Sequence, residues 1–351
     1  MRISTASRSA DGPAWMTLPL EVAGGMLTWR LDSPHDAAPH LHLWSPGDAD
    51  WLWRIVGEQE HVGALTALGD NGADISVERS GDPTQLSILR RLAWGHWLRR
   101  WWPTSVADGI EPLNAAVLDI EVALLTEDCD NYFDADSFDG DPEAIVVGHD
   151  EDAIDSLSTH FSPDVRTLHR RWLARDNSVV TRSENIAVVA DDYALVAGSA
   201  KTAAPSVDAL ARGHASLAWE SVPANTFDAA EDTIAWSIDA APEVVADIAV
   251  ALLPARSAPP LRVELSLATP AMRVHAALDS LGTARITLPL TAIQAWRTDW
   301  STLICAVGEV PGDTSRDLRE QVRAMLRRRL SGADDGIPLF VAEQLVAEAD
   351  Y

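Results

Sequence analysis

The sequence has few thiols and almost no lysine. Its 351 residues include two cysteines, Cys129 and Cys305, and one lysine, Lys201, so arginine supplies nearly all of the positive charge. Two cysteines far apart, with no CxxC pair, exclude a disulfide-stapled scaffold and a cysteine-based metal site. Free thiols are typical of a reducing compartment, and we expect the protein in the cytoplasm.

Long apolar runs and known catalytic motifs are also absent. No stretch of about 18 consecutive apolar residues occurs, which argues against a membrane-spanning helix. Residues 1–25 lack the apolar core of a signal peptide. A Walker loop, a Rossmann fingerprint, an HExxH motif, a GxSxG motif and a kinase signature are all missing. The sequence therefore indicates no cofactor and no membrane contact.

Positive charge is scarce as a whole. The chain has 53 acidic and 27 basic residues, a net charge of −26, while 47% of its residues are apolar and can build a core. A protein that neutralises nucleic-acid phosphates needs a basic surface, so direct nucleic-acid binding is excluded as the default. Attraction to anionic membranes is disfavoured for the same reason.

The negative charge is concentrated in one stretch. Residues 106–160 contain no Lys or Arg and 16 Asp or Glu, most densely between Glu127 and Glu143 and again at 150–152. Arginine-rich helices are expected on both sides of it. The acidic stretch therefore either pairs with these arginines or presents charge to a basic partner. The neighbouring arginines are Arg90, Arg91, Arg99, Arg100, Arg166, Arg170, Arg171 and Arg175.

The N-terminal half combines short strands with helices. Gly24-Gly25 and Asp70-Asn71-Gly72 read as hairpin turns between strands. Apolar residues at steps of three and four predict helices over 84–102 and 109–126, and Ser162-Pro163 predicts the start of a third. The aromatic and arginine-rich stretch 94–103 belongs to the first helix, where core packing is favoured over base stacking or a membrane interface.

Two polar residues of the helix over 109–126 are expected to be buried. At about 100° per residue, Asn114 and Glu121 fall between two apolar stripes. A buried glutamate needs a partner or shifts its pKa upward. In the acidic loop that follows, Tyr132, Phe133 and Phe138 are expected to act as apolar anchors.

After residue 178 the pattern becomes that of β-strands. Residues 261–267, 272–278 and 284–288 alternate apolar and polar side chains, which is typical of half-buried antiparallel strands. A helix is predicted over 314–330, with Arg316, Arg319, Arg323 and 327–329 on a basic face opposite its apolar stripe. The sequence thus predicts an α+β protein. Its parts are a mixed strand and helix domain with an acidic helical segment (1–177), an antiparallel β-sandwich (178–312) and a C-terminal helical segment (313–351).

Three patterns in the sequence suggest metal or catalytic sites, and each also has a plainer interpretation. Counted from Asp139, the residues Asp141, Glu143 and Asp150 match the third, fifth and twelfth positions of a calcium loop, but Ala144 stands where glycine is required. A solvated acidic loop is therefore favoured. A histidine metal cluster could include His35, His40 and His42, with Asp36 nearby, but a third well-placed ligand is not evident from the sequence. A serine–lysine pair could be formed by Ser199 and Lys201, but the sequence has no oxyanion motif.

Two functions remain open. The favoured one is a non-enzymatic interaction or assembly protein, a subunit of a larger complex, whose acidic surface over 127–155 and β-sandwich bind a protein partner with a basic surface. The alternative is a metal-assisted hydrolase that uses carboxylates of 119–152 with a histidine, His149 or His160. The partner-binding candidates are Asp134, Asp136, Asp139, Asp141, Asp150, Glu151 and Asp152; the metal candidates are Asp139, Asp141, Glu143 and Asp150.

Overall fold

The computed structural model describes residues 1–5, 13–71, 75–78, 82–176, 209–308, 315–332 and 336–349. The chain divides into two compact units. Unit 1 comprises Met1–Arg100, Leu113–Ser183 and Ala324–Tyr351, and unit 2 comprises Trp101–Pro112 and Glu184–Arg323. Residues from 324 onward thus group with the N-terminal unit, whereas the sequence suggested a separate C-terminal segment. The boundary expected at 178 lies outside the residues that the structure describes.

Unit 1 contains a five-stranded mixed sheet in the order β2-β3-β4-β1-β5. Only β1 and β4 pair in parallel. The hairpin expected at Gly24-Gly25 joins β2 to β3, and Gly24 has a φ of 69°, the left-handed region that favours glycine. The strands are β1 (Arg2–Ser4), β2 (Thr17–Val22), β3 (Gly25–Arg30), β4 (His40–Leu43) and β5 (Ile75–Ser76).

The hairpin turn predicted at Asp70-Asn71-Gly72 is not present in the two of these residues that the structure describes. Asp70 and Asn71 close the helix α2 (Glu58–Asn71), and Gly72 lies outside the described residues. Turn-forming residues are also common where helices end, so these residue types are compatible with a hairpin turn and with a helix end. The short helix α1 (Trp53–Val56) precedes α2, and 3₁₀ turns lie at η1 (Ala14–Met16), η2 (Pro46–Asp48) and η3 (Asp50–Leu52).

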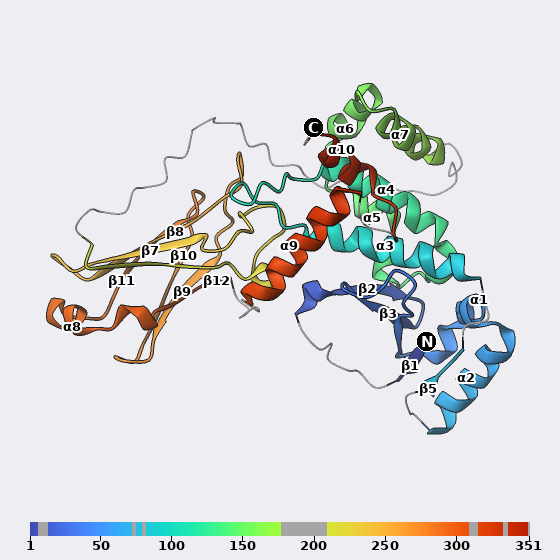
Figure 1. Cartoon of the computed structure of the whole chain (residues 1–351), viewed down its shortest axis with the longest axis horizontal. Coiled ribbons are helices and arrows are strands. Elements are labelled where there is room, and N and C mark those ends of the chain that lie inside the picture. Colours follow the sequence, from blue (N-terminus) through green and yellow to red (C-terminus); the bar gives the residue numbers. More distant parts are fainter. Residues whose placement is uncertain are drawn as a thin grey trace. The chain divides into compact units, whose positions relative to one another are not determined.

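Helix α3 (Pro83–Trp101) runs beside this sheet (Figure 1). Trp94 and Trp97 stack with ring centroids 5.4 Å apart, and both are buried. Trp97 Nε1 donates to the Trp15 carbonyl at 2.7 Å. Trp94 and Trp97 therefore pack in the core, as the helical spacing indicated, while Trp101 is half-buried. The other helices are α4 (Ala115–Asp128), α5 (Pro142–Val146), α6 (Glu151–Ser156), α7 (Pro163–Asp176) and α10 (Val341–Ala349).

One of the two polar residues expected to be buried is exposed. Helix α4 begins at Ala115 instead of near residue 109, so Asn114 is its exposed N-cap and accepts a hydrogen bond from Val117 N at 3.2 Å. Asparagine is favoured at this position because its side chain satisfies an unpaired helix N–H. Glu121, in contrast, is buried as expected.

Unit 2 contains two antiparallel sheets, in the orders β11-β8-β7-β6 and β10-β9-β12. Their strands alternate buried and more exposed residues, as the sequence predicted for 261–288. One hydrophobic cluster includes Ile238 and Ile248 from the first sheet and Val263 and Leu265 from the second. The strands are β6 (Ala211–Ala215), β7 (Ile234–Asp239), β8 (Val245–Val250), β9 (Arg262–Leu267), β10 (Met272–Ala277), β11 (Thr283–Thr287) and β12 (Ile304–Val307).

Two 3₁₀ turns, one short helix and the first half of a long helix complete unit 2. The turns are η7 (Trp219–Ser221) and η8 (Trp300–Thr302), and the short helix is α8 (Ala292–Arg297). The division between the units falls within the long helix α9 (Arg316–Leu330), which was predicted over 314–330. Within the described parts of the chain, no helix is both long and apolar enough to cross a membrane.

The helices and the mainly antiparallel sheets of the two units make the chain an α+β protein.

Candidate functional site

The acidic segment, defined as residues 127–155, is ordered by contacts at a few fixed points. It follows α4 and contains η4 (Asp130–Tyr132), η5 (Phe138–Gly140), α5 and α6. Tyr132 is a buried anchor: its hydroxyl donates to Gln85 Oε1 at 2.7 Å, and its ring lies edge-on to Trp51. Phe138, expected as a second anchor, is instead 84% exposed.

Asp119 of α4 holds the far end of the acidic segment. Its carboxylate accepts a hydrogen bond from Arg99 Nε at 2.7 Å and contacts His149 Nε2 at 2.8 Å. Arg99 also donates to the Ile145 carbonyl at 3.2 Å. One carboxylate thus ties α3 to the loop that follows α5.

Asp139 holds the middle of the acidic segment. Its carboxylate accepts from Glu21 N at 2.8 Å and lies 3.8 Å from His96 Nδ1. Burial lowers the pKa of His96, against the opposing effect of Asp139. Burial, and then the charge of Asp139, raises the pKa of Glu21. The imidazole of His96 is therefore neutral at neutral pH.

These two contacts attach separate parts of the segment to helix α3. His96 and Arg99 are three residues apart on α3 and therefore lie on one face of that helix. Asp139 contacts His96, whereas His149 reaches Arg99 through Asp119. Asp139 and His149 are thus both attached to the same face of α3, His149 by way of Asp119.

Part of the acidic segment pairs with arginines of α7. Arg175 contacts Glu127 at 3.0 Å and also binds Glu143, and its guanidinium lies over the Trp172 ring. Arg171 lies 3.6 Å from Asp128. Some of the negative charge is therefore neutralised within the chain.

The remaining carboxylates face solvent. Asp134 and Asp141 are exposed, and each accepts hydrogen bonds from nearby groups of its own turn. Six further acidic side chains of the segment are exposed and have no hydrogen bond or ion pair to any residue that the structure describes. They are Asp130, Asp136, Asp150, Glu151, Asp152 and Asp155.

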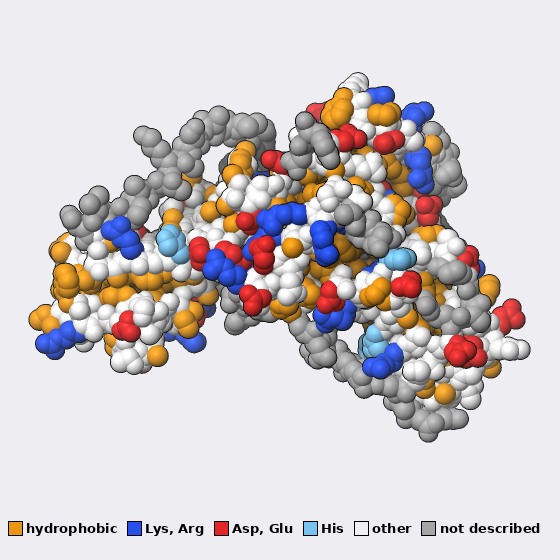
Figure 2. All heavy atoms as spheres, viewed as in Figure 1, with side chains coloured by type: hydrophobic (Ala, Val, Ile, Leu, Met, Phe, Trp, Pro, Cys, Tyr) orange, Lys and Arg blue, Asp and Glu red, His pale blue; other side chains and the backbone are white. Residues whose placement is uncertain are grey.

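Large apolar side chains are exposed beside these carboxylates. Phe138 is 84%, Val147 80% and Phe161 76% exposed. Figure 2 shows carboxylates next to hydrophobic side chains over α6 and α7. We call the following exposed acidic and apolar residues of the acidic segment, taken together, the acidic–apolar surface. It comprises Asp134, Asp136, Phe138, Val147, Asp150, Glu151 and Asp152.

The four carboxylates considered for calcium make separate contacts. Asp139 binds Glu21 N, Asp141 caps α5, and Glu143 pairs with Arg175, while Asp150 precedes α6. Among the residues described, no group of three or more His, Cys, Asp or Glu side chains is arranged to hold a metal ion.

The other candidates from the sequence are dispersed or involved in local contacts. His40 contacts Ser4, His42 lies against Trp44, and His160 Nδ1 accepts from Ser162 N. His35 is exposed and lies close to Gly336. Ser199 and Lys201 lie outside the described residues.

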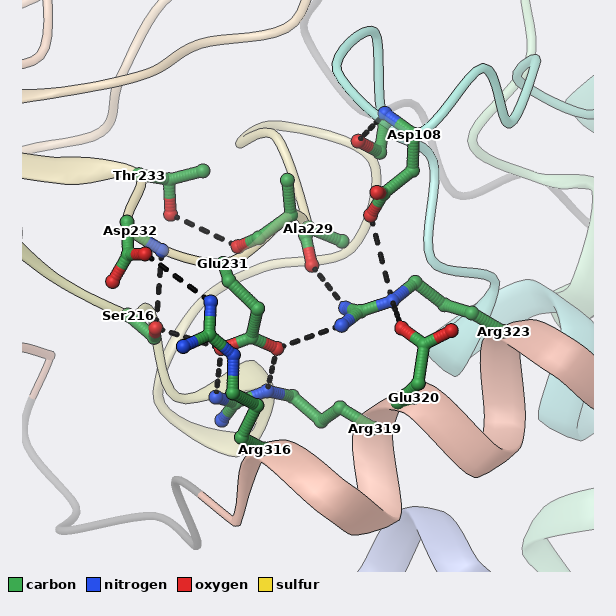
Figure 3. Close-up of polar contacts among 12 residues, drawn as sticks. Asp108, Ser216, Ala229, Glu231, Asp232, Thr233, Arg316, Arg319, Glu320 and Arg323 are labelled. Carbon is green, nitrogen blue, oxygen red and sulfur yellow. Dashed lines mark hydrogen bonds and ion pairs between the residues drawn. The ribbon is translucent and has the colours of Figure 1, made fainter.

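Three of the six arginines predicted on the basic face of α9 are buried, namely Arg319, Arg323 and Arg329, while Arg316, Arg327 and Arg328 are exposed. Glu231 accepts from Arg319 Nε and Nη2 at 2.9 and 2.6 Å, from Arg323 at 2.8 Å and from Ser216 at 2.7 Å (Figure 3). Despite burial, hydrogen bonds from these groups lower the pKa of Glu231 to about 2. Arg319 and Arg323 follow the same three- and four-residue spacing as the buried Val322, and that signal could have identified them.

The second half of α9 is held by another buried pair, within unit 1. Arg329 donates to Glu343 at 2.7 and 2.8 Å, and its guanidinium lies over Trp94. Nearby, Glu121 accepts from Arg91 at 2.6 Å and from Val341 N at 2.7 Å. Because every one of these charges has partners, we assign both arginine clusters to stability.

The two cysteines are also structural. Both are buried free thiols, and burial raises the pKa of each to about 12. A thiol with so high a pKa stays protonated at neutral pH, and the thiolate is the nucleophilic form.

No family model, curated protein or solved structure matches this chain.

Proposed function

We propose that the protein is a non-enzymatic interaction component that binds a protein partner through the acidic–apolar surface. The observation that carries this proposal is the contrast within the acidic segment. Asp119 and Asp139 hold the segment in place, whereas Asp136 and Asp150–Asp152 extend into solvent beside Phe138 and Val147. A rigid base with unpaired charge and exposed apolar groups is typical of a recognition surface.

The charge of this surface defines the chemistry of the partner. Several carboxylates without cationic neighbours repel one another, and a basic surface relieves that repulsion. Complementary charge mainly raises the association rate and the selectivity of binding. The exposed Phe138 and Val147 require apolar groups on the partner as well. The partner is therefore a protein surface or helix with Arg or Lys next to apolar side chains.

Unit 2 supplies a second part of the proposal. Its two antiparallel sheets contribute to one hydrophobic cluster, and we propose that they pack face to face as a β-sandwich. Such a unit offers a second docking surface in a larger complex, by analogy with other sandwiches. The proposed location is the reducing cytoplasm, since both cysteines are free.

The metal-assisted hydrolase has one contact in its favour, that of Asp119 with His149. A metal-dependent site needs about three protein ligands, and the described carboxylates of 119–152 do not converge in that way. His149 Nε2 is engaged by Asp119, which itself binds Arg99. We therefore retain partner binding as the proposal.

Site-specific photocrosslinking tests this proposal. A benzophenone amino acid replaces Phe138 in cells that express the protein, and Val62, 65% exposed on α2, provides the matched position in the same unit. We expect a crosslinked partner at position 138 that is absent at position 62, with Arg or Lys in the linked peptide. A linked peptide without basic residues, or the same product at both positions, would contradict the proposal.

A further inference from the structure

Helix α7 of unit 1 has one buried face and one exposed face. Val165, Leu168 and His169 are buried. At about 100° per residue, the opposite side of the helix carries three arginines and three uncharged residues, while Asp164 lies at its edge. All six are exposed except Arg166, which is half-buried. We call this side the basic face of α7, and it comprises Arg166, Thr167, Arg170, Arg171, Leu173 and Ala174.

Two arginines of the basic face have no carboxylate partner. Arg166 donates to the backbone carbonyls of His160 and Phe161. Arg170 donates to the Arg166 carbonyl at 3.3 Å and to Thr167 Oγ1 at 3.0 Å. Within the described parts of the chain, no Asp or Glu side chain forms an ion pair with either arginine. Neutral oxygens satisfy their hydrogen bonds but leave both guanidinium charges uncompensated.

Apolar side chains are exposed on the basic face and beside it. Leu173 is 46% exposed and lies three residues after Arg170, so the two share one side of the helix. Phe161, two residues before α7, is 76% exposed and stacks on His160 with ring centroids 4.4 Å apart. Arginine and apolar groups are therefore neighbours here, which is the chemistry that the acidic–apolar surface requires of its partner.

The basic face and the acidic–apolar surface do not neutralise each other within one chain. Arg171 and Arg175 make the ion pairs between α7 and the acidic segment, and their partners are Asp128, Glu127 and Glu143. None of these three carboxylates belongs to the acidic–apolar surface. In the part of the chain that the structure describes, the unpaired arginines and the unpaired carboxylates therefore do not meet, and a second copy can bring them together.

We propose that the partner of the acidic–apolar surface is a second copy of this chain, which binds it through the basic face of α7. This inference rests on the proposed function. Guanidinium groups form short, charge-assisted hydrogen bonds with carboxylates, and Leu173 supplies an apolar group for Phe138 and Val147. Because every copy carries both surfaces, two copies make two equivalent contacts and close a twofold dimer, the commonest form of oligomer.

Analytical ultracentrifugation of the full chain tests this inference. We expect a monomer–dimer equilibrium at about 20 mM salt that shifts to monomer at about 500 mM, because salt screens contacts between exposed charges. The variant Arg166→Glu, Arg170→Glu should dimerise at least tenfold more weakly, and Glu151→Arg, Asp152→Arg should do the same. The control Arg297→Glu, Arg328→Glu makes the same change of net charge as the first variant at exposed positions elsewhere, and should dimerise as the wild type does.

A mixture of the two charge-reversed variants distinguishes the proposed pairing from a general effect of charge. Each variant alone brings like charges together at both contacts. In a mixed dimer, both contacts again join opposite charges. We expect the mixture to dimerise within about threefold of the wild type, which requires that both variants are folded.

Photocrosslinking in purified protein tests the same contact without charge reversal. Protein with a benzophenone amino acid at position 138 is mixed with wild type labelled with nitrogen-15. We expect the linked peptide to come from α7 and to carry nitrogen-15, because it belongs to the second copy.

Three outcomes would overturn the second copy as the partner. They are a monomer at low salt, a linked peptide without nitrogen-15, and a monomeric mixture of variants that keep the circular dichroism of the wild type. If position 138 then captures a different protein in cells, with Arg or Lys in the linked peptide, the proposed function stands without the second copy. If it captures neither, the proposed function fails as well.

Discussion

The carboxylates of unit 1 fall into two kinds. Glu343 is fully buried and is held by Arg329 and by Phe340 N, and Glu121 is held by Arg91 and Val341 N. Asp150, Glu151 and Asp152 are exposed and have no partner in the described parts of the chain. A buried carboxylate without its arginine is very costly, whereas an exposed one costs little to keep or remove. The first kind therefore supports the fold, and the second is available for recognition.

The largest effect is expected from Glu343→Gln. This change leaves the Arg329 guanidinium buried without its counter-charge, and such changes cost about 3–5 kcal/mol of the free energy of unfolding. Chemical denaturation followed by circular dichroism measures the loss. Glu348→Gln, at an exposed position on the same helix, should be neutral. Equal stability of the two variants would show that the pair contributes nothing.

A similar effect with a distinct pH dependence is expected from Glu231→Gln in unit 2. The pKa of Glu231 is about 2 in the folded protein and lies below the ordinary value of 4.5. The ion pair therefore stabilises the fold fully above pH 4.5, and this stabilisation is lost as the pH falls from 4.5 towards 2.

Hydrogen exchange of the peptide over β7 measures this difference between wild type and Glu231→Gln. The amides of β7 should be much better protected in the wild type than in Glu231→Gln at pH 7, and this difference in protection should decrease steadily below pH 4.5. Asp239→Asn, on the same strand, provides the comparison variant, since none of the contacts to Glu231 involves it. A difference in protection that stays constant down to pH 2 would show that the charge of the Glu231 carboxylate does not cause it.

A smaller, local effect is expected from Asp119→Asn. Asparagine keeps the shape but removes the charge that Arg99 and His149 share, and we expect a loss of about 1–3 kcal/mol. Amides of residues 145–150 should exchange faster, because that loop is tied down by this contact. Asp130→Asn, an exposed position in the acidic segment, is the control. Unchanged exchange in Asp119→Asn would show that the contact does not hold the segment.

The sequence predicted what depends on regular patterns. Alternation located the strands over 261–288, and Ser162-Pro163 located the start of α7. It also identified Glu121 as buried, because a helical wheel is reliable once the helix exists.

The errors have a common physical cause, which is that tertiary contacts decide among local alternatives. Asn114 suits a helix interior less well than a cap, and the structure uses it as a cap. Phe138 is apolar but exposed, and Arg319 and Arg323 are charged but buried. A wheel cannot tell which arginine meets a glutamate such as Glu231, about 90 residues away.

The smallest effect on stability is expected from neutralising the exposed carboxylates. The variant Asp136→Asn, Asp150→Asn, Glu151→Gln, Asp152→Asn should change the free energy of unfolding by no more than about 0.5 kcal/mol per site, or raise it through lower self-repulsion. Thermal unfolding measures this change. A large loss of stability would mean that these groups support the fold like the buried ones.

The affinity for the partner crosslinked at position 138 tests the central claim most directly. We expect the four-site variant to bind at least tenfold more weakly than the wild type at low salt, and this difference to shrink as salt is added. A control neutralised at four exposed sites elsewhere (Asp36, Glu60, Glu243 and Glu348) should bind as the wild type does. Equal weakening in both variants, or affinity unchanged by neutralisation and by salt, would contradict recognition through the acidic–apolar surface.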